Sequence, residues 1–124
     1  MHWRKKQHKE KYFKKAKVEG YRARSAYKLL QIQKRFRIIQ RGDLVVDLGA
    51  APGSWSQVAA KMVGEQGQVV ALDLQPIDPI PGVTILQGDM TDTAVQAQVT
   101  KALGERPIDV VLSDAAPATT GIKL

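Results

Sequence analysis

The chain has 124 residues, of which 44% are hydrophobic and 25% charged, a composition typical of one compact globular domain and not of a disordered segment. It contains no cysteine, which excludes disulfides and thiolate metal sites and fits the reducing environment of a cytoplasmic protein. No apolar run approaches the ~20 residues that cross a bilayer, so we expect no membrane partner, and we predict no metal site.

The formal net charge is +7, and it is distributed unevenly along the chain. Of the 19 Lys and Arg residues, 15 precede Gly42, and only two acids, Glu10 and Glu19, accompany them. The rest of the chain carries four basic residues against ten acidic ones. We therefore divide the chain into a basic N-terminal arm and helix, residues 1–41, and an acidic body, residues 42–124.

Aromatic residues lie among the charges of the arm, including Trp3, Tyr12 and Phe13. Basic side chains bind phosphates and aromatic rings can stack on unpaired bases, so nucleic acid is the expected partner of the arm. A solvated basic surface, with aromatic rings that anchor the arm to the body, is the alternative. The candidate RNA-binding residues are Arg4, Lys5, Lys6, Lys9, Lys11, Lys14, Lys15, Arg22 and Arg24.

Residues 1–19 fit either a polar helix or a loose arm, which Gly20 interrupts. Beyond it, hydrophobic periodicity and glycine or proline breaks define alternating elements. Helices are predicted at 25–35, 54–63 and 92–103, and strands at 44–48, 68–74, 83–87 and 108–113. Strands that alternate with helices at this spacing predict an α/β fold with a doubly wound sheet.

The first predicted strand runs into a glycine-rich turn, DLGAAPGSWSQ. A dinucleotide site needs the pattern G-x-G-x-x-G, whose backbone N–H groups face a pyrophosphate. Here Ala51 replaces the middle glycine and Pro52 has no N–H, so the turn is a poor pyrophosphate site, and no P-loop lysine follows it. A nucleoside ligand without phosphates fits better, because Gly49 and Gly53 let the backbone approach it closely.

Acidic residues mark the carboxyl ends of the predicted strands, where open α/β sheets bind their ligands. Asp73 is placed to accept both hydroxyls of a ribose, and Asp89 lies where an adenine amino group can be received. Acids such as Asp47 and Asp114 at the neighbouring strand ends suit a cationic sulfonium, which favours S-adenosylmethionine over NAD. Taken singly, each aspartate is more commonly a loop cap. The indication of a ligand site comes from acids at three consecutive strand ends.

Three segments carry a resemblance to a known family: VVDLGAAPGSWSQ, VVALDLQPIDPIPGVTILQGDMTD and DVVLSDAAPATTG. They resemble the FtsJ/RrmJ family of large-subunit ribosomal RNA 2′-O-ribose methyltransferases, and GYRARSAYKLLQI resembles the segment that precedes the core of that family. The resemblance spans about residues 11–121. It implies a Rossmann-like S-adenosylmethionine-dependent methyltransferase fold, and 2′-O-methylation of a uridine ribose in the 23S rRNA of the large ribosomal subunit.

The resemblance also implies roles for individual residues. Lys28 matches the first lysine of the family's catalytic Lys-Asp-Lys-Glu tetrad and Asp114 matches its aspartate, so these two are the candidate catalytic residues. Lys28 is expected to orient the substrate hydroxyl, and Asp114 to pair with a lysine and steady the sulfonium. The candidate cofactor-binding residues are Asp47, Gly49, Pro52, Gly53, Trp55, Asp73, Asp89 and Asp114.

In the family, the second lysine, which acts as the base, and the glutamate lie beyond the position of Leu124. We therefore expect the N-terminal portion of the fold, truncated after the fourth strand, with weak or no turnover. A fragment that binds S-adenosylmethionine and RNA without turnover is the alternative, and Ala51 and Pro52 disfavour an NAD-type dehydrogenase domain. Such truncation leaves the apolar strand at 108–113 as an edge, and exposed edges pair, so we also expect self-association there.

Overall fold

The computed structural model describes residues 20–114 of the chain. Its elements are α2 (Ala26–Phe36), β1 (Leu44–Leu48), α3 (Ser54–Val63), β2 (Gln68–Asp73), β3 (Val83–Gln87), α4 (Thr93–Leu103) and β4 (Val110–Ser113). Each predicted element within this range is confirmed, with ends that differ by at most two residues. The candidate RNA-binding residues of the arm from Arg4 to Lys15 lie outside the described residues.

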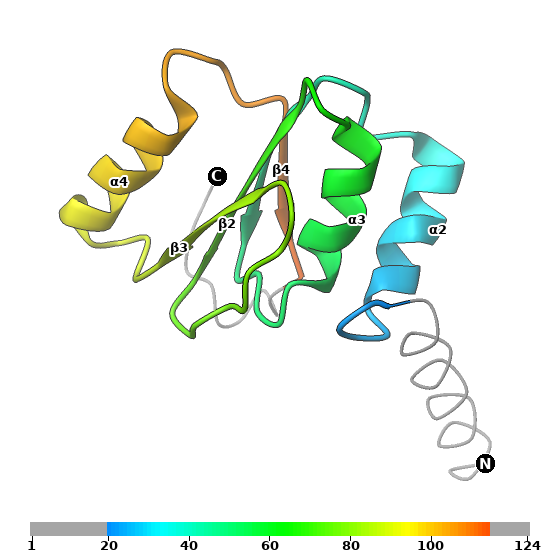
Figure 1. Cartoon of the computed structure of the whole chain (residues 1–124), viewed down its shortest axis with the longest axis horizontal. Coiled ribbons are helices and arrows are strands. Elements are labelled where there is room, and N and C mark those ends of the chain that lie inside the picture. The colour runs from blue at the N-terminus through cyan, green and yellow to red at the C-terminus, as the bar shows by residue number, and fades with distance from the viewer. Residues whose placement is uncertain (1–19, 115–124) are drawn as a thin grey trace, which may run out of the picture.

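The four strands form one parallel sheet in the order β3-β2-β1-β4. Helices cover both faces of this sheet: α4 lies on one side, and α3 and α2 lie on the other (Figure 1). The α/β fold predicted from the sequence is therefore confirmed. Because all four strands run in the same direction, their carboxyl ends meet at one edge of the sheet, where open α/β sheets bind ligands.

Strand β1 lies at the centre of the hydrophobic core, and all five of its residues are buried. Val45 packs with Val58 of α3 on one face of the sheet. Val46 packs with Val95 and Val99 of α4 on the other face. A strand covered on both faces needs apolar residues at consecutive positions, which explains the unbroken run that identified this strand in the sequence.

Helix α2 belongs to the same core as the body of the protein. Ala26 and Leu29 are fully buried and join the cluster around Val45. The side-chain amide of Gln33, in the last turns of α2, donates to the carbonyl oxygen of Ile39, which follows the helix, and accepts from its N–H. The division that we predicted at residue 41 follows the charge of the sequence, whereas the packing is continuous from residue 26 onward.

The turn between α3 and β2 leaves no room for a side chain at Gly67. A Cβ atom there would lie 2.3 Å from the Cβ of Val63 and 2.8 Å from the carbonyl oxygen of Asp43. Neither atom is the free end of a flexible side chain, so the backbone itself must move. We expect Gly67→Ala to lower the free energy of unfolding by about 1–3 kcal/mol, measured by urea denaturation. Gln66→Ala, which places alanine at an exposed position of the same turn, is the control, and an equal midpoint for both variants would contradict the prediction.

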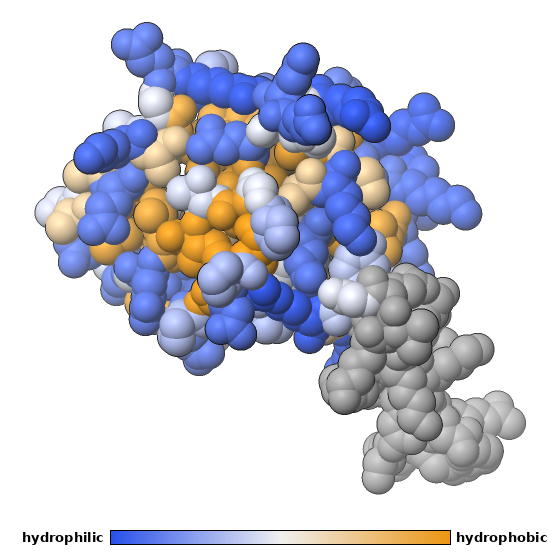
Figure 2. Space-filling view, in the orientation of Figure 1, coloured by the Kyte–Doolittle hydropathy of each residue, from blue (hydrophilic) through white to orange (hydrophobic). Residues whose placement is uncertain are grey.

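Strands β3 and β4 form the two edges of the sheet. Val111 in β4 is 42% exposed and Ile108 before it 44%, in line with the exposed edge that the sequence predicts. Figure 2 shows apolar side chains near the middle of the visible face, surrounded by polar ones. Self-association through the β4 edge stays a prediction. Within residues 20–114, no helix is long and apolar enough to cross a membrane.

Candidate active site

A cleft of about 230 Å³, open solvent space included, lies where the carboxyl ends of β1 and β4 meet the N-terminal ends of α2 and α3. Five of the candidate cofactor-binding residues line it, and Gly53, Asp73 and Asp89 do not. The lining residues are Ser25, Asp47, Gly49, Ala50, Ala51, Pro52, Ser54, Trp55 and Asp114.

In the glycine-rich turn from Gly49 to Gly53, hereafter the glycine turn, the first three backbone N–H groups donate to other parts of the protein. The N–H groups of Gly49 and Ala50 both donate to the carbonyl oxygen of Leu72, at 2.9 and 3.1 Å. The N–H of Ala51 donates to Oδ2 of Asp73 at 2.8 Å, and Pro52 has no N–H. Phosphate sites at such turns depend on free backbone donors. The geometry therefore argues against a pyrophosphate ligand more strongly than the sequence does.

Asp47 is the most deeply buried carboxyl group of the cleft, with 1% of its surface exposed. Burial raises its pKa to about 6; the hydrogen bond from Ser56 Oγ lowers the pKa, and the negative charges of Asp114 and Asp73 raise it further. Ser56 Oγ donates to Asp47 Oδ2 at 2.7 Å. Three carboxylates near one cleft favour a ligand that carries positive charge.

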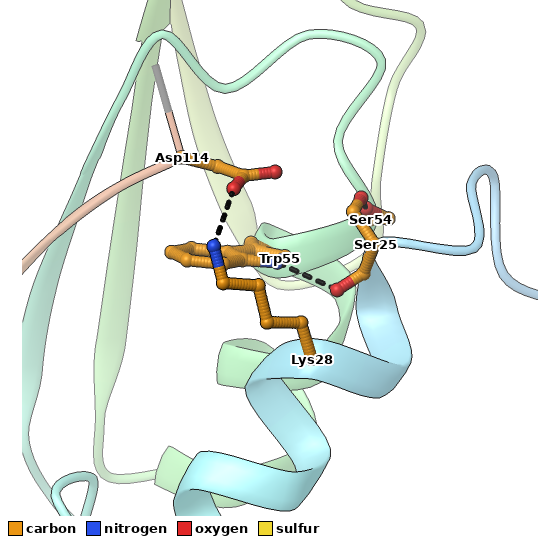
Figure 3. A network of polar contacts seen from close by, with 5 residues as sticks. All are labelled: Ser25, Lys28, Ser54, Trp55 and Asp114. Atoms are coloured by element: carbon orange, nitrogen blue, oxygen red, sulfur yellow. Dashed lines mark hydrogen bonds and ion pairs between the residues drawn. The ribbon is translucent and has the colours of Figure 1, made fainter. Parts of the chain in front are cut away.

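Trp55 connects the two helices that begin at the cleft (Figure 3). Its Nε1–H donates to the carbonyl oxygen of Ser25 at 2.8 Å, and the Ser25 and Ser54 hydroxyl oxygens lie 2.7 Å apart. Sequence reasoning missed both serines as site residues. Their positions at helix starts, where serine is common as a cap, give a signal for them, but Ser25 makes no capping bond and its hydroxyl contacts Ser54 instead.

The two candidate catalytic residues meet at the mouth of the cleft. Lys28 Nζ lies 3.6 Å from Asp114 Oδ1 and 5.9 Å from the centre of the Trp55 ring (Figure 3). Lys28 comes from α2 and Asp114 directly follows β4, so the fold brings together residues from opposite ends of the described chain. Both side chains are accessible to solvent, and exposed ion pairs add little to stability. The arrangement leaves the ammonium group available to a bound substrate.

The carboxylates of Asp73 and Asp89 accept hydrogen bonds from loop residues, and one bond of Asp73 reaches the glycine turn. Asp73 accepts from Ala51 through Oδ2 and from the N–H of Gln75 through Oδ1, at 2.8 Å each. Asp89 Oδ1 accepts from the N–H and the hydroxyl of Thr91, and these bonds lower the pKa of the exposed Asp89 carboxyl group. These are the loop-capping roles that single aspartates commonly have. Their contacts with the ribose and the adenine remain predictions.

Gly53 has a role that the sequence does not indicate. Its φ is +113°, and a Cβ atom there would lie 2.6 Å from Cδ1 of Ile80. The space beside its Cα is thus filled by a neighbouring loop, and the residue lies outside the cleft lining.

Of the candidate RNA-binding residues that the structure describes, Arg24 is exposed. Arg22 is half-buried, and its guanidinium donates to backbone carbonyl oxygens of two loops.

The open parallel sheet, with an acidic cleft beside a glycine turn at the carboxyl ends of its strands, places the chain among the doubly wound α/β domains, whose ligand sites lie at this edge. The family model of FtsJ-like methyltransferases matches residues 21–124. The chain belongs to this family of methyltransferases.

Among its relatives is the ribosomal RNA large subunit methyltransferase E of Pseudomonas paraeruginosa, 48% identical over 98% of this chain and 58% of the relative. The protein of the same name from an Azoarcus species is 54% identical over 90% of this chain and 54% of the relative. A crystal structure described as a ribosomal RNA methyltransferase from Plasmodium falciparum superposes with a TM-score of 0.71 at 30% identity, covering 82% of this chain and 60% of that one. The chain thus spans little more than half the length of the curated relatives it matches.

Proposed function

We propose that the cleft binds S-adenosylmethionine, and that Lys28 and Asp114 act in methyl transfer to the 2′-hydroxyl of a uridine in 23S rRNA. The observation that carries this proposal is the Lys28–Asp114 ion pair at the mouth of an acidic cleft. The relatives, named as ribosomal RNA large subunit methyltransferases, support the same substrate class.

The residues of the cleft suit this cofactor. S-adenosylmethionine carries positive charge on its sulfonium and its amino group, and the carboxylates of Asp47 and Asp114 line the cleft with opposite charge. Trp55 adds apolar surface to the same wall. When bound, S-adenosylmethionine supplies an electrophilic methyl group. The first three N–H groups of the glycine turn are already donated within the protein, so they are not available to a phosphate on the ligand.

The chain's own residues orient the acceptor. The Lys28 ammonium has three N–H donors, and its pairing with Asp114 holds it at the cleft mouth. A donor directed at the substrate hydroxyl oxygen from there fixes the direction in which that oxygen faces the cleft. Correct orientation of the two reacting groups lowers a bimolecular barrier substantially, because the translational and rotational freedom is lost on binding and not during the reaction. The basic arm is the proposed contact with the rRNA.

Cofactor choice is tested by isothermal titration of the chain with S-adenosylmethionine and, separately, with NAD. We expect saturable one-site binding of S-adenosylmethionine and no heat from NAD, because the N–H groups of Gly49, Ala50 and Ala51 are already donated within the protein and Pro52 has none. Asp114→Asn, which keeps the size of the side chain and removes its charge, should bind the cationic cofactor more weakly. Equal binding of both ligands would contradict the assignment.

Methyl transfer is followed with S-adenosylmethionine labelled in its methyl group and unmethylated large-subunit rRNA as acceptor. A 2′-O-methyl group removes the hydroxyl that attacks the neighbouring phosphodiester in alkali, so the label should remain in alkali-resistant dinucleotides. Lys28→Ala should reduce this label. Label recovered in modified bases would refute ribose methylation, and cofactor binding without any transfer would leave the alternative of a binding fragment.

A further inference from the structure

Arg22 lies between the glycine turn, which lines the cleft, and the loop that follows β2. Its Nη1 donates to the carbonyl oxygens of Pro52 and Asp78, at 3.1 and 2.6 Å, and its Nη2 donates to the carbonyl oxygen of Pro79 at 2.6 Å. Its own backbone N–H donates to Oε1 of Gln57 in α3 at 2.9 Å. One side chain thus joins the N-terminal segment to the glycine turn and to residues 74–82, hereafter the proline loop.

The glycine turn and the proline loop also contact each other directly. Ile77 and Ile80 of the proline loop pack against Ala50 of the turn in one apolar cluster. Gly53 admits Cδ1 of Ile80 beside its Cα, and the Nη1 of Arg22 borders the same space. The packing of the two loops therefore leaves Arg22 at the point where they meet, with carbonyl oxygens of both directed at its guanidinium.

We propose that Arg22 is a positioning residue for the cofactor site, which holds the glycine turn against the proline loop and so fixes the wall of the cleft from Gly49 to Pro52. A planar guanidinium presents donors along two edges of a rigid fork, which lets it bridge carbonyl groups of separate segments. Bonds from a charged donor are stronger than those between neutral groups. The identity of the ligand rests on the proposed function, whereas the position of Arg22 rests on the observed hydrogen bonds.

This role differs from the RNA contact predicted for Arg22 from the sequence. A residue that serves RNA binding keeps its donors free for phosphates, whereas Arg22 directs both terminal nitrogens at backbone carbonyl oxygens. The two roles predict different effects of removing Arg22 on cofactor affinity. Removal of a positioning residue weakens cofactor binding when no RNA is present, and removal of an RNA contact does not.

The test compares Arg22→Ala, Arg22→Lys and, as a matched control, Arg35→Ala, which removes an exposed arginine from the last turn of α2. All are made with Trp3→Phe, so that Trp55, which lines the cleft, is the remaining tryptophan. Its fluorescence is titrated with S-adenosylmethionine without RNA. We expect Arg22→Ala to raise Kd about tenfold, because all three guanidinium hydrogen bonds are lost and the glycine turn must then be ordered when the cofactor binds. Arg22→Lys should recover part of this affinity, and Arg35→Ala should bind normally.

Hydrogen exchange of the ligand-free proteins gives a readout that does not depend on the cofactor. In Arg22→Ala, peptides covering residues 49–53 and 74–82 should exchange faster, and the strands of the core should not. If the unsubstituted chain binds no S-adenosylmethionine, the proposed function fails and exchange alone decides the role of Arg22. Unchanged exchange in both loops, or exchange that rises equally throughout the protein, would overturn the proposal. If Arg22→Ala fails to fold, Arg22→Lys is judged by the same two measurements.

Discussion

The Asp47→Asn protein is expected to be more stable than the unsubstituted chain at pH 7.5, and to bind S-adenosylmethionine more weakly. Burial raises the pKa of Asp47 to about 6, so at pH 7.5 the folded state holds a negative charge in a site with 1% exposure. Asparagine has nearly the same shape, and its carbonyl oxygen can accept the Ser56 hydrogen bond. The substitution removes the buried charge and should raise the free energy of unfolding by roughly 1–3 kcal/mol.

The pH dependence of this gain follows from the direction of the shift. The folded state keeps the Asp47 proton up to a pH of about 6, whereas the unfolded chain releases it near the ordinary aspartate pKa of 3.8. Between these values the folded state binds more protons than the unfolded chain. The free energy of unfolding of the unsubstituted chain therefore falls as the pH rises through this range. The difference between the variant and the unsubstituted chain should therefore be small at pH 4 and fully present above pH 7.

Thermal unfolding of both proteins at pH 4 and pH 7.5 checks this prediction. Glu65→Gln, which neutralises an exposed carboxylate, is the control and should show no comparable gain. A difference that does not change with pH would show that the Asp47 carboxyl group titrates normally. A gain in stability together with a loss of cofactor affinity would identify Asp47 as a residue whose charge serves binding at a cost to the fold.

Trp55→Ala is expected to give the largest loss of stability among the variants of the cleft. Trp55 is 7% exposed and belongs to the core cluster of α2, α3 and β1, and truncation of such a side chain costs about 3–5 kcal/mol. It would also leave the carbonyl oxygen of Ser25 without its indole donor. The N-terminal end of α2 should loosen, and Lys28 would move with it.

Trp55→Phe separates the packing of the ring from its hydrogen bond. Phenylalanine keeps most of the apolar contact and removes the Nε1–H donor, so we expect a smaller loss of about 1–2 kcal/mol. Urea denaturation followed by circular dichroism measures both variants. Equal losses for the two substitutions would show that the hydrogen bond to Ser25, and not the ring, provides most of the stabilisation. A loss below 1 kcal/mol for Trp55→Ala would contradict the packing argument.

The elements and their order were predictable because the local sequence carries both. A short run such as LVVDL, with two valines and glycines on either side, indicates a strand covered on both faces, and β1 is buried at every position. The start of α4 was readable in the same way. Asp92 lies before the apolar pattern, and its side chain caps the helix by accepting from the N–H of Ala94.

The predictable part of the site is the part that follows directly from a strand end. Asp47 and Asp114 were expected near one another because parallel strands β1 and β4 end at the same edge, and both line the cleft. The Ser25–Ser54 contact and the partners of Arg22 depend on how α2 packs against α3 and the loops. No local pattern encodes that packing, because it joins segments that are distant along the chain. The sequence showed a charged arginine in a basic segment, and only the fold shows what it contacts.

The sheet order also determines when the cleft can exist during synthesis. Strand β4, the last that the structure describes, lies directly beside β1, the first. A chain that leaves the ribosome with its N-terminus first can pair β1, β2 and β3 while β4 is still being made. At that stage Lys28 in α2 has not yet met Asp114, because Asp114 follows β4. A small molecule that needs both the glycine turn and Asp114 would therefore not bind these early nascent chains. Its binding would show that β4 has paired with β1.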